Sequence, residues 1–221
     1  MASAISTAIA KDHRELETYY NNILEAPDND TATRWQNQFT WELARHSIAE
    51  ELVVYPAFEK YLGDNGHIMA EKDREEHQVV SRSLSLLRRV YSFPDPNSSR
   101  VWSSNANTPQ QIKDKLKIFQ DLDAGIPQFI PTLVSLMDDL AQHMKEEENE
   151  DLPALNAAIS KDDAKGMEKE FRRTKSFVPS RSHPLAPNRP PFETVAGLMA
   201  APIDRLGDML RKFPDPDEAR V

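Results

Sequence analysis

Apolar residues recur every three or four positions along most of this 221-residue chain, and this periodicity constrains its fold more than any other feature. Between residues 31 and 54, for example, Trp35, Phe39 and Leu43 fall on one face of a helix. The same spacing runs through residues 3–25, 67–92, 108–119, 129–150 and 195–213. No stretch alternates apolar and polar residues as a half-buried strand does. The sequence therefore predicts an all-α protein.

Turn and cap residues divide the periodic pattern into separate helices. Pro56 is predicted to kink or end the first part of the second helix, and Gly63-Asp64-Asn65-Gly66 to stop the helical turns after Pro56. Thr108-Pro109 and Ser160 mark two further predicted helix starts. Four helices with short connections favour an antiparallel, up-down four-helix bundle, which we expect over residues 1–160.

Residues 161–221 are predicted to form a C-terminal helical extension of this bundle. A short helix to about Thr174 is followed by a proline-rich stretch, 175–192, which predicts an extended tether. The amphipathic segment 195–213 then predicts a final helix. Two interpretations of this helix stay open: it covers apolar surface of its own domain, or it docks on another protein or subunit.

Composition and charge exclude several classes of protein. The chain has a net charge of −9 and no cysteine. The negative charge argues against non-specific nucleic-acid binding, which needs a cationic surface. Without cysteine, any metal must be held by histidine, carboxylate or solvent, and disulfides and iron–sulfur clusters are excluded. The sequence shows neither a secretory signal nor a membrane span, so we expect a cytoplasmic protein that binds neither nucleic acid nor membrane.

Two copies of a His-x-x-x-Glu pattern, His46–Glu50 and His143–Glu147, lie on different predicted helices. Residues four apart lie on one helix face, so each pair could hold a metal ion from one side. Taken alone, each pair is a weak signal, because a histidine near an apolar face is more often a hydrogen-bonded core residue. Glu50 could also be half-exposed, and Glu147 could belong to the solvated acidic run 146–148.

The joint pattern is stronger than any of its parts. Each of four predicted helices carries one histidine at a position compatible with the core. These are His13, His46, His77 and His143. A buried carboxylate needs a partner or a metal, because burying it alone is costly. We therefore expect a two-metal site in which the two glutamates bridge the ions and the histidines complete their shells. Mixed imidazole and carboxylate ligands suit non-haem iron, with manganese or zinc as alternatives.

These residues resemble the hemerythrin-like, or HHE cation-binding, domains. The resemblance covers roughly residues 3–160 and depends on an ordered set of short motifs. The motifs are Asp12-His13-Arg14-Glu15-Leu16, His46-Ser47-Ile48-Ala49-Glu50-Glu51 with Tyr55-Pro56, Glu76-His77, and His143-Met144-Lys145-Glu146-Glu147. The resemblance implies an up-down four-helix bundle around a non-haem, usually di-iron, centre. It also implies that the terminal ligands are His13, His46, His77 and His143. The bridging ligands would then be Glu50 and Glu147.

The chain departs from the oxygen-carrying hemerythrins at two points. Those proteins have a second histidine four residues from the one on the third helix, where this chain has Asp73 and Ser81 around His77. They also have an aspartate five residues after the last histidine, a position that Glu148 holds here. The resemblance is therefore nearer to the sensor-like and iron-handling members of the family than to reversible oxygen stores.

Three hypotheses for the function stay open. The first is an intracellular di-iron protein that binds oxygen, peroxide or nitric oxide, or that senses or buffers iron. The second is an enzyme whose di-iron centre acts on oxygen or peroxide, with Tyr20 and Tyr55 as candidate redox neighbours. The third is a metal-free, acidic helical protein that binds partners through its C-terminal helix. The sequence is consistent with a monomer or a homodimer.

Overall fold

The chain folds into helices alone over the part that the computed structural model describes, which comprises residues 2–78, 112–181, 201–202, 204–215, 217 and 219. These described residues contain no strand, so the predicted all-α class is confirmed. The elements are, in order, α1 (Ala4–Leu24), α2 (Asn29–Ala49), the π-helical turn η1 (Glu50–Val54), α3 (Tyr55–Gln78), α5 (Ile112–Gln120), α6 (Phe129–Glu146), the π-helical turn η2 (Glu147–Asp151), α7 (Leu152–Ala158) and α8 (Lys161–Lys175). None of the helices described here combines the length and the apolar character that crossing a membrane requires.

Side-chain caps explain where three of the helices begin. Ser3 precedes α1, and its hydroxyl accepts a hydrogen bond from the backbone N–H of Ser6 at 3.3 Å. Asp28 caps α2 in the same way through the N–H of Thr31, at 2.8 Å. Ser160 caps α8, so the helix start predicted there is confirmed.

One glycine bends the chain within α3, and a second allows the two parts of this helix to approach closely. Gly63 has a φ of 61° and a ψ of −135°, and this conformation divides α3 into residues 55–62 and 64–78. At Gly66 an added Cβ atom would lie 1.9 Å from the carbonyl oxygen of Phe58, so only glycine allows the two parts to approach this closely. The predicted stop in this stretch is therefore confirmed as a kink.

Two prolines follow π-helical turns instead of ending a helix. Pro56 comes shortly after η1 and Pro153 shortly after η2, and the chain is helical on both sides of each turn. In each turn a backbone N–H reaches back five residues to the carbonyl of the first residue, Glu50 or Glu147. A proline has no N–H to donate and its ring crowds the preceding helical turn, and a wider turn accommodates both properties. The kink predicted at Pro56 therefore takes the form of a π-turn.

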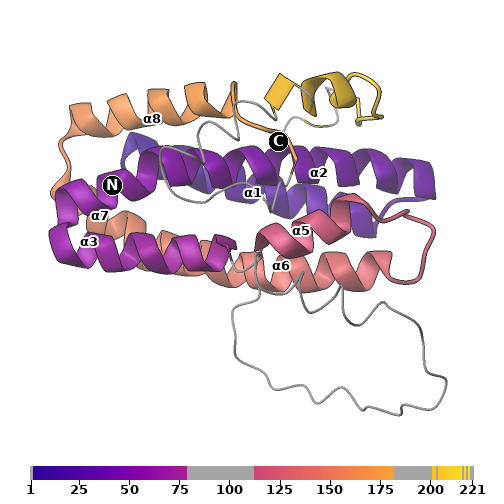
Figure 1. Ribbon diagram of the computed structural model, residues 1–221, viewed down its shortest axis with the longest axis horizontal. Helices are drawn as coiled ribbons and strands as arrows, with labels where there is room; N and C mark the ends of the chain where they lie inside the picture. The colour runs from indigo at the N-terminus through magenta and orange to yellow at the C-terminus, as the bar shows by residue number, and fades with distance from the viewer. Residues whose placement is uncertain are drawn as a thin grey trace, which may run out of the picture.

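Figure 1 shows how the helices are arranged. Helices α1 and α2 run side by side along the long axis, with α3, α5 and α6 on one side of this pair and α8 on the other. Helix α8 contacts both α1 and α2. The up-down order of four antiparallel helices stays a prediction, because residues 79–111, including the predicted helix start at Thr108-Pro109, lie outside the described residues.

The described part of the C-terminal segment lies against α2 (Figure 1). Arg181 is buried, and its guanidinium donates a hydrogen bond to the side-chain oxygen of Asn37 at 2.8 Å. The backbone N–H of Arg181 donates to Asp204 at 3.1 Å. Among the described residues of this segment, Leu206, Met209 and Leu210 are large apolar residues with exposed side chains. Polar contacts thus hold this segment to its own chain, and the division at residue 160 stays a prediction.

Candidate metal centre

A belt of buried polar side chains crosses the core between two apolar clusters. One cluster includes Leu16, Phe39, Leu43 and Leu140. The other includes Ile9, Ala49, Val54 and Leu152. The belt consists of His13, His46, Glu50, His143 and Glu147, and each of these residues is at most 4% exposed. Ionisable groups in such a place need charge partners or a cation, because an apolar core cannot solvate them.

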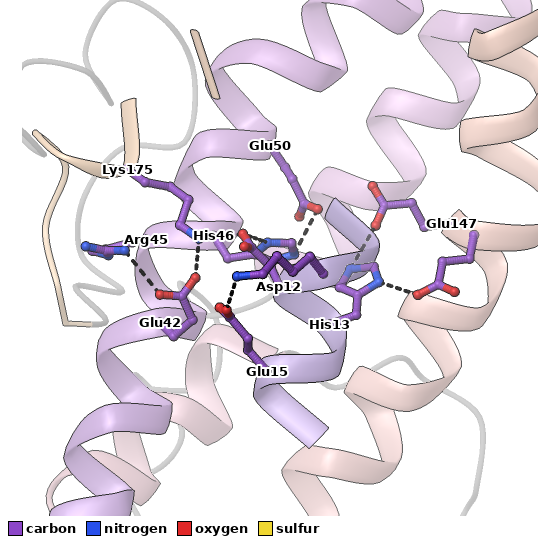
Figure 2. A network of polar contacts seen from close by, with 11 residues as sticks. Asp12, His13, Glu15, Glu42, Arg45, His46, Glu50, Glu147 and Lys175 are labelled. Atoms are coloured by element: carbon purple, nitrogen blue, oxygen red, sulfur yellow. Dashed lines mark hydrogen bonds and ion pairs between the residues drawn. The ribbon is translucent and has the colours of Figure 1, made fainter. Parts of the chain in front are cut away.

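The Nε2 atoms of two histidines point at the two glutamates of the belt (Figure 2). His46 Nε2 lies 2.9 Å from Glu50 Oε1, and His13 Nε2 lies 3.4 Å from Glu147 Oε2. Both Nε2 atoms are buried, and neither has a well-aligned hydrogen-bond partner among the described residues. The two imidazole rings meet edge to face with centroids 5.0 Å apart. Two nitrogen donors and two carboxylates therefore converge on one buried place.

The opposite nitrogen of each ring is held by a further carboxylate. His46 Nδ1 lies 3.1 Å from Asp12 Oδ2, and His13 Nδ1 lies 2.7 Å from Glu148 Oε1. A carboxylate at Nδ1 favours the tautomer with the proton on that nitrogen, which leaves the lone pair on Nε2. Both rings therefore present their metal-binding nitrogen to the belt.

Two overlapping sets of side chains could each hold one ion. The first set is His13, His46 and Glu50, and the second is Glu50, His143 and Glu147. Within each set the ligand atoms lie within 4.8 Å of one another. Glu50 belongs to both sets, and its carboxylate has two oxygen atoms. The donor chemistry, imidazole nitrogen with carboxylate oxygen, fits a pair of iron, manganese or zinc ions.

The neighbouring carboxylates raise the pKa of both imidazoles. Burial lowers the pKa of His46, but the charge of Glu50 and the hydrogen bond to Asp12 outweigh it, and the pKa lies well above 6.5. Burial also lowers the pKa of His13, but contacts with its two glutamate partners raise it further, and the net shift is upward. Burial raises the pKa of Asp12, yet the bond to His46 helps to lower it to about 2. The belt thus attracts positive charge, as protons or as metal ions.

Two other buried groups respond to the negative charge of the belt. Burial and the charge of Glu147 raise the pKa of Asp151 to about 6. Burial and the charge of Glu50 raise the pKa of Tyr55 well above 10. Two tyrosines were considered as redox neighbours. The charge of the belt affects the pKa of Tyr55, whereas Tyr20 packs against the apolar cluster of Leu16.

The structure brings together five of the six residues predicted as metal ligands. These are His13, His46, Glu50, His143 and Glu147. Their role as ligands stays a prediction. The sixth, His77, belongs to α3, but its side chain lies outside the described residues.

Sequence reasoning missed the residues that surround the belt. Asp12 stands directly before His13 in the sequence, yet it contacts His46 on the next helix. Glu148 belongs to the acidic run that the sequence suggested is solvated, yet it binds the ring of His13. Helix α8 contributes Phe171, whose ring packs edge to face on His46 at 5.9 Å between centroids. The carboxylates were visible in the sequence, but their partners depend on how the helices pack.

Comparison with known proteins points to one family. The hemerythrin HHE cation binding domain matches residues 4–155 of this chain. An uncharacterised hemerythrin-like protein of Schizosaccharomyces pombe is 51% identical over 210 residues, which cover 95% of this chain and 88% of that protein. No solved structure matches the chain significantly.

Proposed function

Because this chain belongs to the hemerythrin HHE cation-binding family, we propose that its buried belt holds a non-haem centre of two metal ions, with iron as the metal. In this proposal the bridges are Glu50 and Glu147, and the terminal ligands are His13, His46, His77 and His143. The centre binds a small ligand such as oxygen, peroxide or nitric oxide, and the protein handles or senses iron in the cytoplasm.

One observation carries the proposal: Glu50 belongs to both sets of potential ligands. A carboxylate shared by two sets is what a bridged pair of ions requires. Glu50 is fully buried, and Glu147 reaches the second set while also facing His13 at 3.4 Å. Two independent mononuclear sites would not need to share a side chain.

The residues present fit iron better than a purely structural role. The described core places two carboxylates and three imidazoles in one belt between apolar clusters. A core with no metal function would fill this layer with apolar side chains, because buried ion pairs rarely stabilise more than such packing does. Imidazole with carboxylate is the donor set that non-haem iron prefers, and no thiolate is present in the chain.

Bound iron supplies Lewis acidity and one-electron exchange to a small ligand. Residues of the chain orient the ligands and exclude water. Asp12 and Glu148 orient two imidazole rings through their Nδ1 atoms. The two apolar clusters on either side exclude bulk water from the belt. The enzymatic and metal-free alternatives stay hypotheses.

Iron loading tests the proposal. The purified protein is incubated with iron(II) without oxygen, desalted and assayed for metal by mass spectrometry. We expect about two ions per chain, because each ligand set holds one. The His143→Ala variant should lose iron and melt at a lower temperature than the loaded parent, since metal binding stabilises the folded state.

His67→Ala is the matched control, because it removes the same kind of side chain from a second group of potential ligands, Glu59, His67 and Glu71, which is not buried and lies outside the belt. This variant should keep its full iron content. Equal iron in the parent and in His143→Ala would overturn the proposal, as would a parent that takes up no iron. A peroxide turnover assay on the loaded protein then separates an enzyme from a passive binder.

A further inference from the structure

We propose that helix α8, which lies beyond the matched family region, is a working part of the metal centre, acting through the chain of contacts Lys175–Asp12–His46. Asp12 and Lys175 are then positioning residues for the His46 imidazole. The inference rests on the proposed function, because it concerns how tightly one of the two ions is held.

The contacts meet at a single atom. Oδ2 of Asp12 accepts a hydrogen bond from the ammonium group of Lys175 and also lies 3.1 Å from His46 Nδ1. The ammonium group donates to Glu42 as well, so one cation is shared by two carboxylates (Figure 2). The side chains of Lys175 and Asp12 are each 11% exposed. At this degree of burial, water screens the contacts only weakly.

The same helix also touches His46 directly. Phe171, one turn before Lys175, meets the His46 ring at an interplanar angle of 85°. Helix α8 therefore confines the ring by packing on it and by fixing the carboxylate that holds its Nδ1. Both contacts come from residues outside 4–155, the part of the chain that the family match covers.

The imidazole of His13 has a similar set of contacts, in which the cation comes from another helix. Around His13 the order is the same, since Arg14 donates to Glu148 at 2.6 Å and Glu148 lies 2.7 Å from Nδ1. There the cation comes from α1 itself, and its side chain is 53% exposed. Two cation–carboxylate–imidazole chains therefore support the centre. Only the one at His46 takes its cation from the C-terminal extension.

This arrangement predicts how the substitution of Asp12 or Lys175 weakens metal binding. An asparagine at position 12 cannot accept the Nδ1 proton as strongly and can present its amide N–H₂ instead, which favours the wrong tautomer of His46. Without the ammonium of Lys175, the carboxylates of Asp12 and Glu42 repel each other, and Asp12 turns away from the ring. The ion held by His46 should then bind more weakly, and the other ion should be affected less.

The test is a cobalt(II) titration of the full chain, followed by visible absorption, which reports both affinity and coordination geometry. Loss of an outer-shell partner typically costs 10–100-fold in metal affinity, so we expect a loss of about that size for Asp12→Asn at one of the two ions. Lys175→Met should cost about tenfold or less at the same ion. Lys175→Arg should restore binding. Lys169→Met, an exposed lysine of α8, is the matched control and should bind as the parent does.

The double variant Asp12→Asn/Lys175→Met decides whether Lys175 acts through Asp12. We expect it to bind no more weakly than Asp12→Asn alone, because the contact that Lys175 supports is already lost. Additive losses, or a Lys175→Met variant that behaves as Lys169→Met does, would overturn the inference while leaving the metal centre intact. A parent that binds neither cobalt nor iron would overturn the proposed function and this inference with it.

Discussion

Glu50 and Glu147 hold equivalent positions in two copies of one structural unit. Each is the first residue of a π-helical turn, each follows a histidine by one helical turn, and each precedes a proline. The two copies are His46-x₃-Glu50-x₅-Pro56 and His143-x₃-Glu147-x₅-Pro153. The fold therefore presents two carboxylates to the belt by the same backbone device, on helices that are far apart in the sequence.

Both glutamates are proposed as bridges, so the replacement of either should weaken the binding of both ions. Glu50 belongs to both ligand sets, and Glu147 belongs to one set and faces His13 of the other at 3.4 Å. Glu50→Gln and Glu147→Gln should therefore each reduce the iron content to below about one ion per chain. Metal analysis after anaerobic loading and desalting measures this. Glu150→Gln, an exposed residue of η2, should retain the full content. A variant that retains one ion or more per chain would contradict the bridging role of its glutamate.

The prolines should matter for the metal more than for stability. Pro56→Ala restores a backbone N–H and permits an ordinary α-helical turn, which would change the direction of the Glu50 side chain. We expect metal affinity about tenfold lower or more, with no loss in the melting temperature of the metal-free protein. Pro127→Ala, in the exposed turn before α6, should change neither quantity. Unaltered metal affinity in Pro56→Ala would show that the π-turn forms without its proline.

Metal-free stability should fall as the pH rises above neutrality. The pKa of His46 in the folded protein lies well above the ordinary 6.5, and that of His13 is also raised. The stabilisation from these protonated rings is complete below pH 6.5 and is lost as the pH rises through the raised pKa values. Each pH unit between the unfolded and folded pKa of a ring corresponds to about 1.4 kcal/mol of stability. Metal ions displace the same protons, so the rise in melting temperature on adding iron(II) should grow over this range.

Thermal melts between pH 6 and 9, with iron(II) or with a chelator under nitrogen, measure both trends. The His67→Ala variant should follow the parent, because His67 is exposed and lies outside the belt. A chelator-treated protein that gains stability over this range would show that the belt histidines are neutral in the folded state.

Three glycines should respond differently to replacement by alanine. Gly63→Ala forces a positive φ on a residue with a side chain, at a cost of about 1–2 kcal/mol, although the new Cβ meets nothing within 4 Å. Gly66→Ala should cost more, because its Cβ would overlap the Phe58 carbonyl. Gly166→Ala, in the open on α8, should stabilise the protein by about 0.5–1 kcal/mol. Urea unfolding of the metal-free variants gives the three free energies, and a different rank order would refute the close approach in α3.

Much of this molecule follows from local sequence pattern. The apolar spacing predicts helices, and Asp28 and Ser160 show why they begin where they do. The His-x-x-x-Glu pairs predict two side chains on one helix face, because residues four apart share a face. His46 and Glu50 show this, with 2.9 Å between the facing atoms. These features depend on neighbours within a few residues, so the sequence alone determined them.

Contacts between helices depended on the tertiary structure. Asp12 lies beside His13 in the sequence but binds His46, and Glu148 binds His13 although it lies 135 residues further along the chain. Lys175 is the first residue of the predicted tether, yet it lies at the end of α8 and donates a hydrogen bond to Asp12. Periodicity fixes the face on which a side chain lies but not the helix that meets that face, since this depends on packing of the whole core. The sequence therefore determined the candidate ligands, and only the tertiary structure decided which charges support them.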